Sequence, residues 1–325
     1  MRRINRLILT SKPVSTIRNR SKKTFIPGFH GLPLYDVYRF FIEQIKKEGL
    51  NVRAAAISFN FMMAIPAATI FLCTLIPYLP ISNDIHTALL HIAKDITPNS
   101  DTQKMITSFL DDFFTNRTTG LLSIGFVLAI FYSSNAMMGV IRTFDRSLVQ
   151  KHKANFIHKR LRALKLTIIL MLLIIGTALI SAGQGALFPV IMKWLNIKNT
   201  TTKAWIQNLR WIVIIVLVLY SVAFIYKYAP SVHKRWKLLS PGAIFATFLI
   251  ILATWLFSIW AQNFSNYNKF YGSIGTILML MLLIFINSLV LLIGYELNIS
   301  ITYLKAAAEQ RSEVEAAAKK QQQLQ

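Results

Sequence analysis

Acidic residues and cysteine are both scarce in this chain. Its 325 residues include 13 Asp and Glu against 36 Lys and Arg, and its single cysteine is Cys73. One cysteine excludes an intrachain disulfide and any cysteine-rich metal site. Charged residues make up 15% of the chain and hydrophobic residues 54%. The apolar residues are gathered in long blocks with almost no charge inside them, which excludes an ordinary soluble domain and indicates membrane spans.

Six apolar blocks are each close to the ~20 residues that cross a hydrocarbon core about 30 Å thick. These blocks are 54–79, 120–141, 161–182, 211–228, 242–261 and 274–295. Lipid offers no hydrogen-bond partner to the backbone, so apolar spans of this length must be helical. The sequence therefore predicts an all-α polytopic membrane protein whose membrane domain, 34–304, is a six-transmembrane-helix bundle.

Three shorter helices are predicted around the bundle. Apolar residues between Leu34 and Ile45 recur at helical spacing opposite a charged face, which is typical of an interfacial amphipathic helix on the inner membrane surface. The loop 78–119 holds two further periodic apolar stretches on either side of Pro98. These stretches predict two short external helices that cover the outer end of the bundle.

The two ends of the chain lack an apolar stripe. Residues 1–33 are basic and rich in Ser, Thr and Pro, and they are expected to form a disordered cytoplasmic arm. A mitochondrial transit peptide is the alternative interpretation of this segment. Residues 305–325 are mostly Ala, Glu, Lys and Gln, which predicts a solvent-exposed cytoplasmic helical tail.

Orientation follows from the distribution of Lys and Arg between the two sets of loops. The segments on the side of the N-terminus carry 27 of these residues, whereas the opposite loops carry 8. Basic residues are retained on the cytoplasmic side, so both termini are predicted to be cytoplasmic. The basic segment 142–162 is expected to face anionic lipid headgroups.

Three stretches carry a family resemblance: "NVRAAAISFNFMMAIPA" at 51–67, "YAPSVHKRWKLLSPGAIFAT" at 228–247, and "FSNYNKFYGSIGTILMLMLLIFINSLVLLIGYELNISI" at 264–301. Over 35–303 the chain resembles the YihY/virulence factor BrkB family of bacterial inner-membrane proteins. That resemblance implies six spans and a location in the cytoplasmic membrane, with transport as a proposal. Phe59 and Phe61 replace tyrosines that are usual in the family's first span, which puts the role of those hydroxyls in question.

Proteins similar to this one have been labelled ribonuclease BN, but the residues here argue against an enzyme. A metal-dependent nuclease needs clustered His and carboxylate ligands, and the six histidines are scattered along the chain. Common hydrolase and nucleotide-binding motifs are absent from the sequence as well. We therefore expect no catalytic residues, no cofactor, no metal and no nucleic-acid partner.

Polar residues within the blocks are the candidate lining of a transport pathway. Asn60, Asn135 and Asn287 could line a shared cavity, or they could bond between helices and stabilise the bundle. An aromatic loop that contains Tyr267, Tyr271 and Gly272 precedes the sixth block and is predicted to gate such a cavity.

Small residues and one acid mark expected helix contacts. Gly125 with Ala129, and Gly242 with Ala246, have the spacing of close helix crossings. Glu296 is the only acid between Asp145 and the tail, and it lies at the cytoplasmic end of the sixth block. A carboxylate there needs a cation or solvent, and the predicted partners are Arg53 and Arg142. A coupling or substrate role for Glu296 is the alternative to a structural ion pair.

Three functions are compatible with these observations. The first is a permease or exporter of an anionic or amphipathic solute, which the polar span residues and basic inner rim favour. The second is a non-catalytic membrane scaffold that binds partners through its arm or tail, and the third is a membrane-bound enzyme. The sequence identifies neither a substrate nor an oligomeric state.

Overall fold

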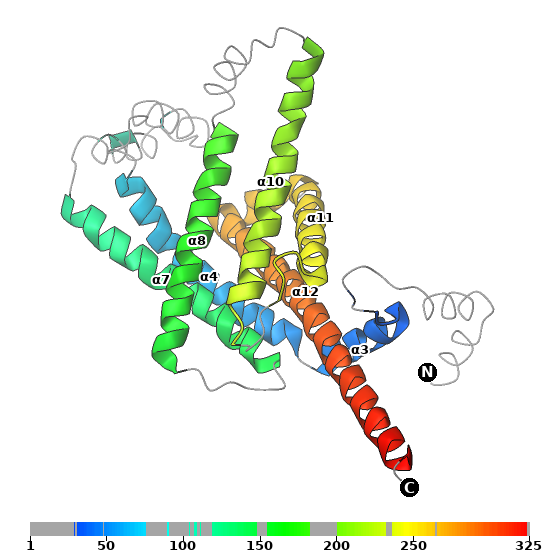
Figure 1. Ribbon diagram of the computed structural model, residues 1–325. Helices are drawn as coiled ribbons and strands as arrows, with labels where there is room; N and C mark the ends of the chain where they lie inside the picture. Colours follow the sequence, from blue (N-terminus) through cyan, green and yellow to red (C-terminus); the bar gives the residue numbers. More distant parts are fainter. Residues whose placement is uncertain are drawn as a thin grey trace.

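A computed structural model of the full chain was analysed. It describes residues 29, 31–47, 49–75, 119–147, 155–182, 200–231, 236–263 and 265–323, and a few isolated positions between 90 and 111. Seven helices occupy these residues: α3 (Leu34–Lys47), α4 (Leu50–Leu75), α7 (Thr119–Ser147), α8 (Phe156–Ala182), α10 (Thr200–Tyr228), α11 (Pro241–Asn263) and α12 (Ser265–Gln323). The predicted all-α class is confirmed for this part of the chain (Figure 1).

Each predicted apolar block coincides, over most of its length, with one of the helices from α4 to α12. Within the described residues, four helical segments are long and apolar enough to cross a membrane: Leu50–Phe71, Leu122–Ser147, Pro241–Ala261 and Ile277–Ala317. The apolar segment Ile212–Tyr228 is shorter. The structure therefore supports several membrane-spanning helices, and the count of six remains a prediction.

Several helices extend well beyond the apolar blocks. Helix α10 begins at Thr200, eleven residues before its block, and α12 continues to Gln323 as a single helix of 59 residues. Hydropathy marks where a helix is apolar, whereas backbone hydrogen bonding continues wherever helix-forming residues follow. The tail is therefore helical and exposed, as predicted, but it is continuous with the last apolar helix.

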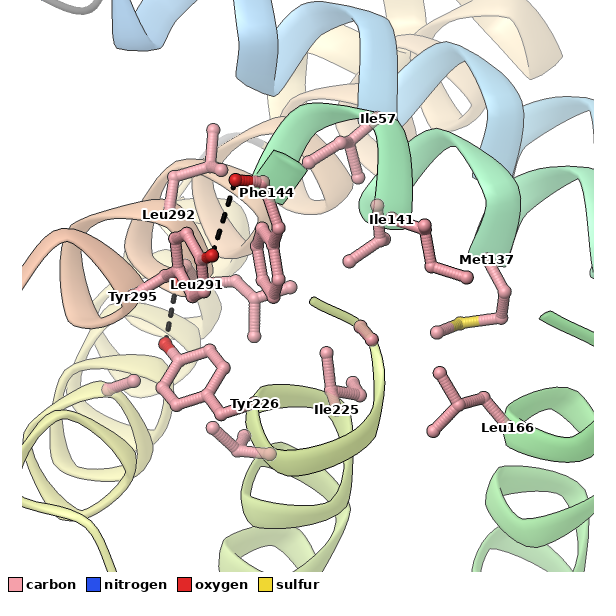
Figure 2. Packing of buried hydrophobic residues seen from close by; sticks show 14 of the residues in the cluster. Ile57, Met137, Ile141, Phe144, Leu166, Ile225, Tyr226, Leu291, Leu292 and Tyr295 are labelled. Atoms are coloured by element: carbon pink, nitrogen blue, oxygen red, sulfur yellow. Dashed lines mark hydrogen bonds between the residues drawn. The ribbon is translucent and has the colours of Figure 1, made fainter. Parts of the chain in front are cut away.

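Helix α4 packs against α7 and α12, and α11 packs along α12, so that helices from the two halves of the chain share one core (Figure 1). The core gathers side chains from α4, α7, α8, α10 and α12, among them Ile57, Met137, Leu166, Tyr226 and Tyr295 (Figure 2). Most of its members come from the ends of these helices nearest the basic segments. The core therefore joins the helices at one end of the bundle.

Small residues set the closest helix crossings, as their spacing predicted. A Cβ on Gly294 would lie 2.5 Å from the Cβ of Ala246 and 2.6 Å from the hydroxyl of Tyr226, and a Cβ on Gly242 would collide with the carbonyl of Gly294. Glycine at both positions is therefore required for the approach of α11 to α12. Gly125 similarly faces the backbone of α4 at Phe71, at 3.4 Å from a Cβ to the Cα.

Helix α3 occupies the stretch predicted to be amphipathic, but part of its apolar face is covered by protein. Val37 is 1% exposed and clusters with Phe29 and with Ile301 of α12. The Phe40 ring also stacks on Tyr303, with 4.8 Å between ring centroids. Helix α3 thus uses this face to hold α12, and its placement on a membrane surface remains a prediction. Most of the predicted disordered arm and both predicted external helices lie outside the described residues.

Candidate functional site

A buried ion pair joins the first and last apolar helices. Arg53, in the first turn of α4, donates from Nη1 to Oε1 of Glu296 in α12 at 2.9 Å. The side chain of Arg53 is 4% exposed and that of Glu296 is fully buried. Charges removed from water need a partner of opposite sign, and a charge-assisted hydrogen bond supplies one. This contact therefore connects segments 243 residues apart.

Helix α7 completes the cluster with its last turn. Nη2 of Arg53 donates to the carbonyl of Thr143 at 2.8 Å and to Oγ of Ser147 at 2.5 Å. Ser147 Oγ in turn donates to Oε1 of Glu296 at 2.5 Å. A cation beside the C-terminal end of a helix interacts favourably with the helix dipole. Three helices therefore meet at one guanidinium group.

The sequence suggested Arg53 and Arg142 as partners of Glu296, and the structure pairs Glu296 with Arg53. Arg142, the other candidate, has an exposed side chain. Helical geometry accounts for the choice, because Arg142 lies one residue from Ile141 and Thr143, both of which are buried, and points to a different side of α7. Ser147 and the Thr143 carbonyl were not anticipated, since a serine and a backbone oxygen carry no sequence signal of a charged partner.

A second polar cluster lies at the same end of the bundle. The carboxylate of Asp145 accepts from the backbone N–H of Ser231 at 2.9 Å and from its hydroxyl at 3.1 Å, and it pairs with Nζ of Lys159 at 2.7 Å. Nη1 of Arg162 donates to Ser231 Oγ at 2.9 Å. The cluster joins α7, α8 and the segment after α10. Asp145 is the only acid in the basic segment 142–162, and that isolation was the signal that could have identified it.

Aromatic side chains from α7, α10 and α12 pack together at this end of the bundle. The rings of Phe144 and Tyr295 stack at 3.8 Å between centroids, and Trp236 meets Tyr295 edge-on at 5.4 Å. The Tyr295 hydroxyl donates to the Phe144 carbonyl, and the Tyr226 hydroxyl donates to the Leu291 carbonyl (Figure 2). Both tyrosine hydroxyls therefore have a hydrogen-bond partner, so these aromatic side chains add apolar packing without leaving a hydroxyl unsatisfied.

The three candidate asparagines bond at separate places. Asn60 donates to the carbonyl of Ala56 in its own helix at 2.7 Å, and it packs against Gly139 of α7. Asn135 accepts from Arg160 of α8, and Asn287 accepts from Thr254 of α11 at 3.5 Å. Two of the three bonds connect neighbouring helices. A cavity shared by the three residues remains a prediction.

The candidate gate is helical, whereas the sequence predicted a loop. Tyr267, Tyr271 and Gly272 lie in the first turns of α12, which begins at Ser265, and not in a loop. The expectation of a loop came from the density of Asn, Ser, Tyr and Gly in this stretch. Such residues are tolerated at the ends of helices near a membrane interface, where polar and amphipathic side chains meet water. Their role as a gate stays a prediction.

No group of three His, Cys, Asp or Glu side chains that could hold a metal ion occurs among the described residues. Most of the polar atoms of the two clusters instead bond to one another. Chemically, this arrangement can hold or exchange an ion pair between helices.

Known proteins resemble this chain over most of its length. A Bacillus subtilis protein whose name calls it ribonuclease-like, YfkH, is 28% identical over 246 residues, which cover 76% of this chain and 88% of that protein. A UPF0761 membrane protein of Idiomarina loihiensis is 22% identical over 268 residues, or 81% of this chain and 89% of its own length. No solved structure matches the chain.

The family assignment rests on the same region that holds both polar clusters. Residues 41–320 match the family described as Virulence factor BrkB, and this range includes Arg53, Asp145 and Glu296. Relatives named as membrane proteins agree with the four helical segments long and apolar enough to span a bilayer. The chain is therefore a membrane protein that belongs to the Virulence factor BrkB family.

Proposed function

We propose that this protein is a permease or exporter of an anionic or amphipathic solute in the bacterial cytoplasmic membrane. In this proposal the chain crosses the membrane six times, with both termini in the cytoplasm. The excess of Lys and Arg in the segments on one side supports that orientation. The same basic residues would concentrate anionic solutes at the inner opening.

The observation that carries the proposal is the buried Arg53–Glu296 pair. Ionised groups inside a membrane bundle are costly, and in membrane proteins they commonly mark a path for solutes, ions or protons. Here both partners are almost fully buried, and both belong to helices with an apolar segment long enough to span the membrane. A pair that joins α4 to α12 through α7 can close one end of the bundle and reopen when those helices move apart.

The distribution of burial along the helices supports a bundle that is closed at one end. In α12 most residues of 288–301 are buried, whereas none in 277–287 is. The same change occurs in α11, where burial stops after Thr247, and in α10, where none of 212–221 is buried but Val222 is. Figure 1 shows α8 and α10 diverging from the other helices away from this end. Transporters that open alternately to the two sides need one closed end at each stage.

A flux assay in proteoliposomes tests the proposal. The purified protein would be reconstituted with two anionic probes, carboxyfluorescein as the polar one and a fluorescent lysophosphatidylglycerol as the amphipathic one. We expect faster movement of at least one probe than in protein-free vesicles, and a loss of that flux in Glu296→Gln at equal amounts of folded, inserted protein. Glu309→Gln is the matched control, because Glu309 is an exposed acid on the same helix. No flux of either probe above the protein-free rate would contradict the proposal.

A scaffold is the second candidate, and the surface between α3 and the end of α12 favours it. This groove is lined by charged side chains of both signs, including Asp36, Arg39, Glu43, Arg311 and Glu315. Exposed charges of alternating sign on a helix are suited to a helical partner. Deletion of residues 306–325 would test this candidate. A scaffold loses its co-purifying partner after the deletion, whereas a permease retains its flux.

A further inference from the structure

The first turns of α8 place an arginine among apolar side chains without an acid beside it. Nη1 of Arg160 donates to Oδ1 of Asn135, and the guanidinium carbon lies 5.0 Å from the centre of the Phe131 ring. Among the described residues, no carboxylate lies within ion-pair distance of Arg160. Asn135 is neutral, so the positive charge of Arg160 is not balanced by these contacts.

Asp145, the acid of the neighbouring polar cluster, already has partners. Asp145 pairs with Lys159 at 2.7 Å and accepts two hydrogen bonds from Ser231. Lys159 and Arg160 are adjacent in sequence, but they reach residues ten positions apart on α7. The crossing of α7 and α8 in Figure 1 makes this possible. Arg160 is therefore a cation of this crossing that can accept an external anion.

The surroundings of Arg160 are apolar and uncovered. Phe131 is 49% exposed, and Phe156 and Ile157, which lie one turn before Arg160 on α8, are 66% and 76% exposed. Large apolar side chains around a half-buried cation would be unfavourable in water, but they suit the boundary between acyl chains and headgroups. On α7 the exposed residues Ile124, Val127 and Leu128 continue from Phe131 along one face at helical spacing. An acyl chain can lie along this face below a headgroup at Arg160.

We propose that Arg160, with Asn135 and Phe131, forms a binding site for the phosphate of an anionic phospholipid at the crossing of α7 and α8. Asn135 holds one edge of the guanidinium, which leaves its other N–H groups for two phosphate oxygens. The Phe131 ring supports the cation from one side and contacts the lipid with the other. This site is independent of transport, since a lipid bound there stabilises the α7–α8 crossing whether or not a solute moves.

Lipid binding to the purified full chain in mild detergent tests the proposal. Bound palmitoyl-oleoyl phosphatidylglycerol would be measured against phosphatidylcholine by native mass spectrometry and by the shift in melting temperature. We expect a preference for phosphatidylglycerol, and about tenfold weaker binding in Arg160→Gln, because one charged hydrogen-bonded contact is removed. Arg311→Gln is the matched control, since Arg311 is an exposed arginine in the tail of α12, outside the basic segment 142–162.

Two further measurements distinguish the possible outcomes. Arg160→Lys keeps the charge and the aliphatic stem but loses the planar fork, so we expect binding between that of the native protein and that of Arg160→Gln. Millimolar inorganic phosphate should not displace the lipid, because it lacks acyl chains for the exposed face of α7. Equal binding of the two lipids, an unchanged preference in both Arg160 variants, or displacement by inorganic phosphate would each overturn the proposal.

Discussion

Arg53 is the residue at which buried polar contacts join α4, α7 and α12. Its guanidinium binds a carboxylate, a hydroxyl and a peptide carbonyl contributed by two other helices. A pair of this kind is not in itself strongly stabilising, because both ions lose hydration when they are buried. The pair instead favours one arrangement of α4 and α12, since any other arrangement would leave one of the two charges buried without its partner.

The energetic consequence can be measured with a double-mutant cycle on this pair. We expect Glu296→Gln or Arg53→Gln alone to lower the free energy of unfolding by about 3 to 5 kcal/mol, because each leaves one buried charge without its counterion. The double variant should be less destabilised than the sum of the two, because neither charge remains. Equilibrium unfolding in detergent micelles would measure these changes, with Glu309→Gln as the control. Additive effects in the double variant would show that the two side chains do not interact.

At the scale of elements, the crossing of α11 and α12 depends on the absence of two side chains. We predict that Gly294→Ala and Gly242→Ala each destabilise the protein by about 1 to 3 kcal/mol or more, because the added methyl group meets backbone or buried atoms that cannot move aside. Melting in detergent would measure the loss. Gly176→Ala in α8 is the control, since a Cβ there has no neighbour within 4 Å. Equal melting temperatures for all three variants would mean that the helices do not approach this closely.

At the scale of the whole molecule, the predicted orientation can be tested with an impermeant maleimide. In a Cys73→Ser background, a cysteine at Ser312 should react only after cells are permeabilised, whereas one at Lys94 should react in intact cells. The opposite orientation would require 27 basic residues, instead of 8, to be moved across the membrane, and this costs more free energy. Labelling of the Ser312→Cys variant in intact cells would reverse or reject the topology.

A second prediction for the whole molecule concerns nuclease activity, which the name of the Bacillus relative raises. We expect the purified protein not to cleave RNA, because basic residues without a metal site or an acid–base pair bind phosphates but provide no route to cleavage. Incubation with labelled RNA and divalent metal ions measures this directly. Cleavage that follows the protein through purification and is lost in a His86→Ala/His91→Ala variant would show that the expectation is wrong.

Much of the architecture was determined by the sequence alone. Hydropathy located the apolar parts of six helices, because the cost of burying unpaired peptide groups in lipid leaves the chain no other structure there. The periodicity of 34–45 located α3, and the small residues around Gly242 located a close crossing. Glu296 was recognised as needing a cation because an isolated acid beside a long apolar run cannot stay ionised without one.

Only the tertiary structure decided which groups meet. Arg53 and Arg142 were equivalent candidates in the sequence, and the rotation of α7 exposes Arg142 while α4 directs Arg53 to Glu296. The pairing of Asp145 with Ser231 depends on where the segment after α10 meets α7, and the isolation of Arg160 from any acid among the described residues depends on how α7 and α8 cross. Hydropathy and periodicity are local properties of a segment, whereas contacts between residues 86 or 243 positions apart depend on how the whole bundle packs.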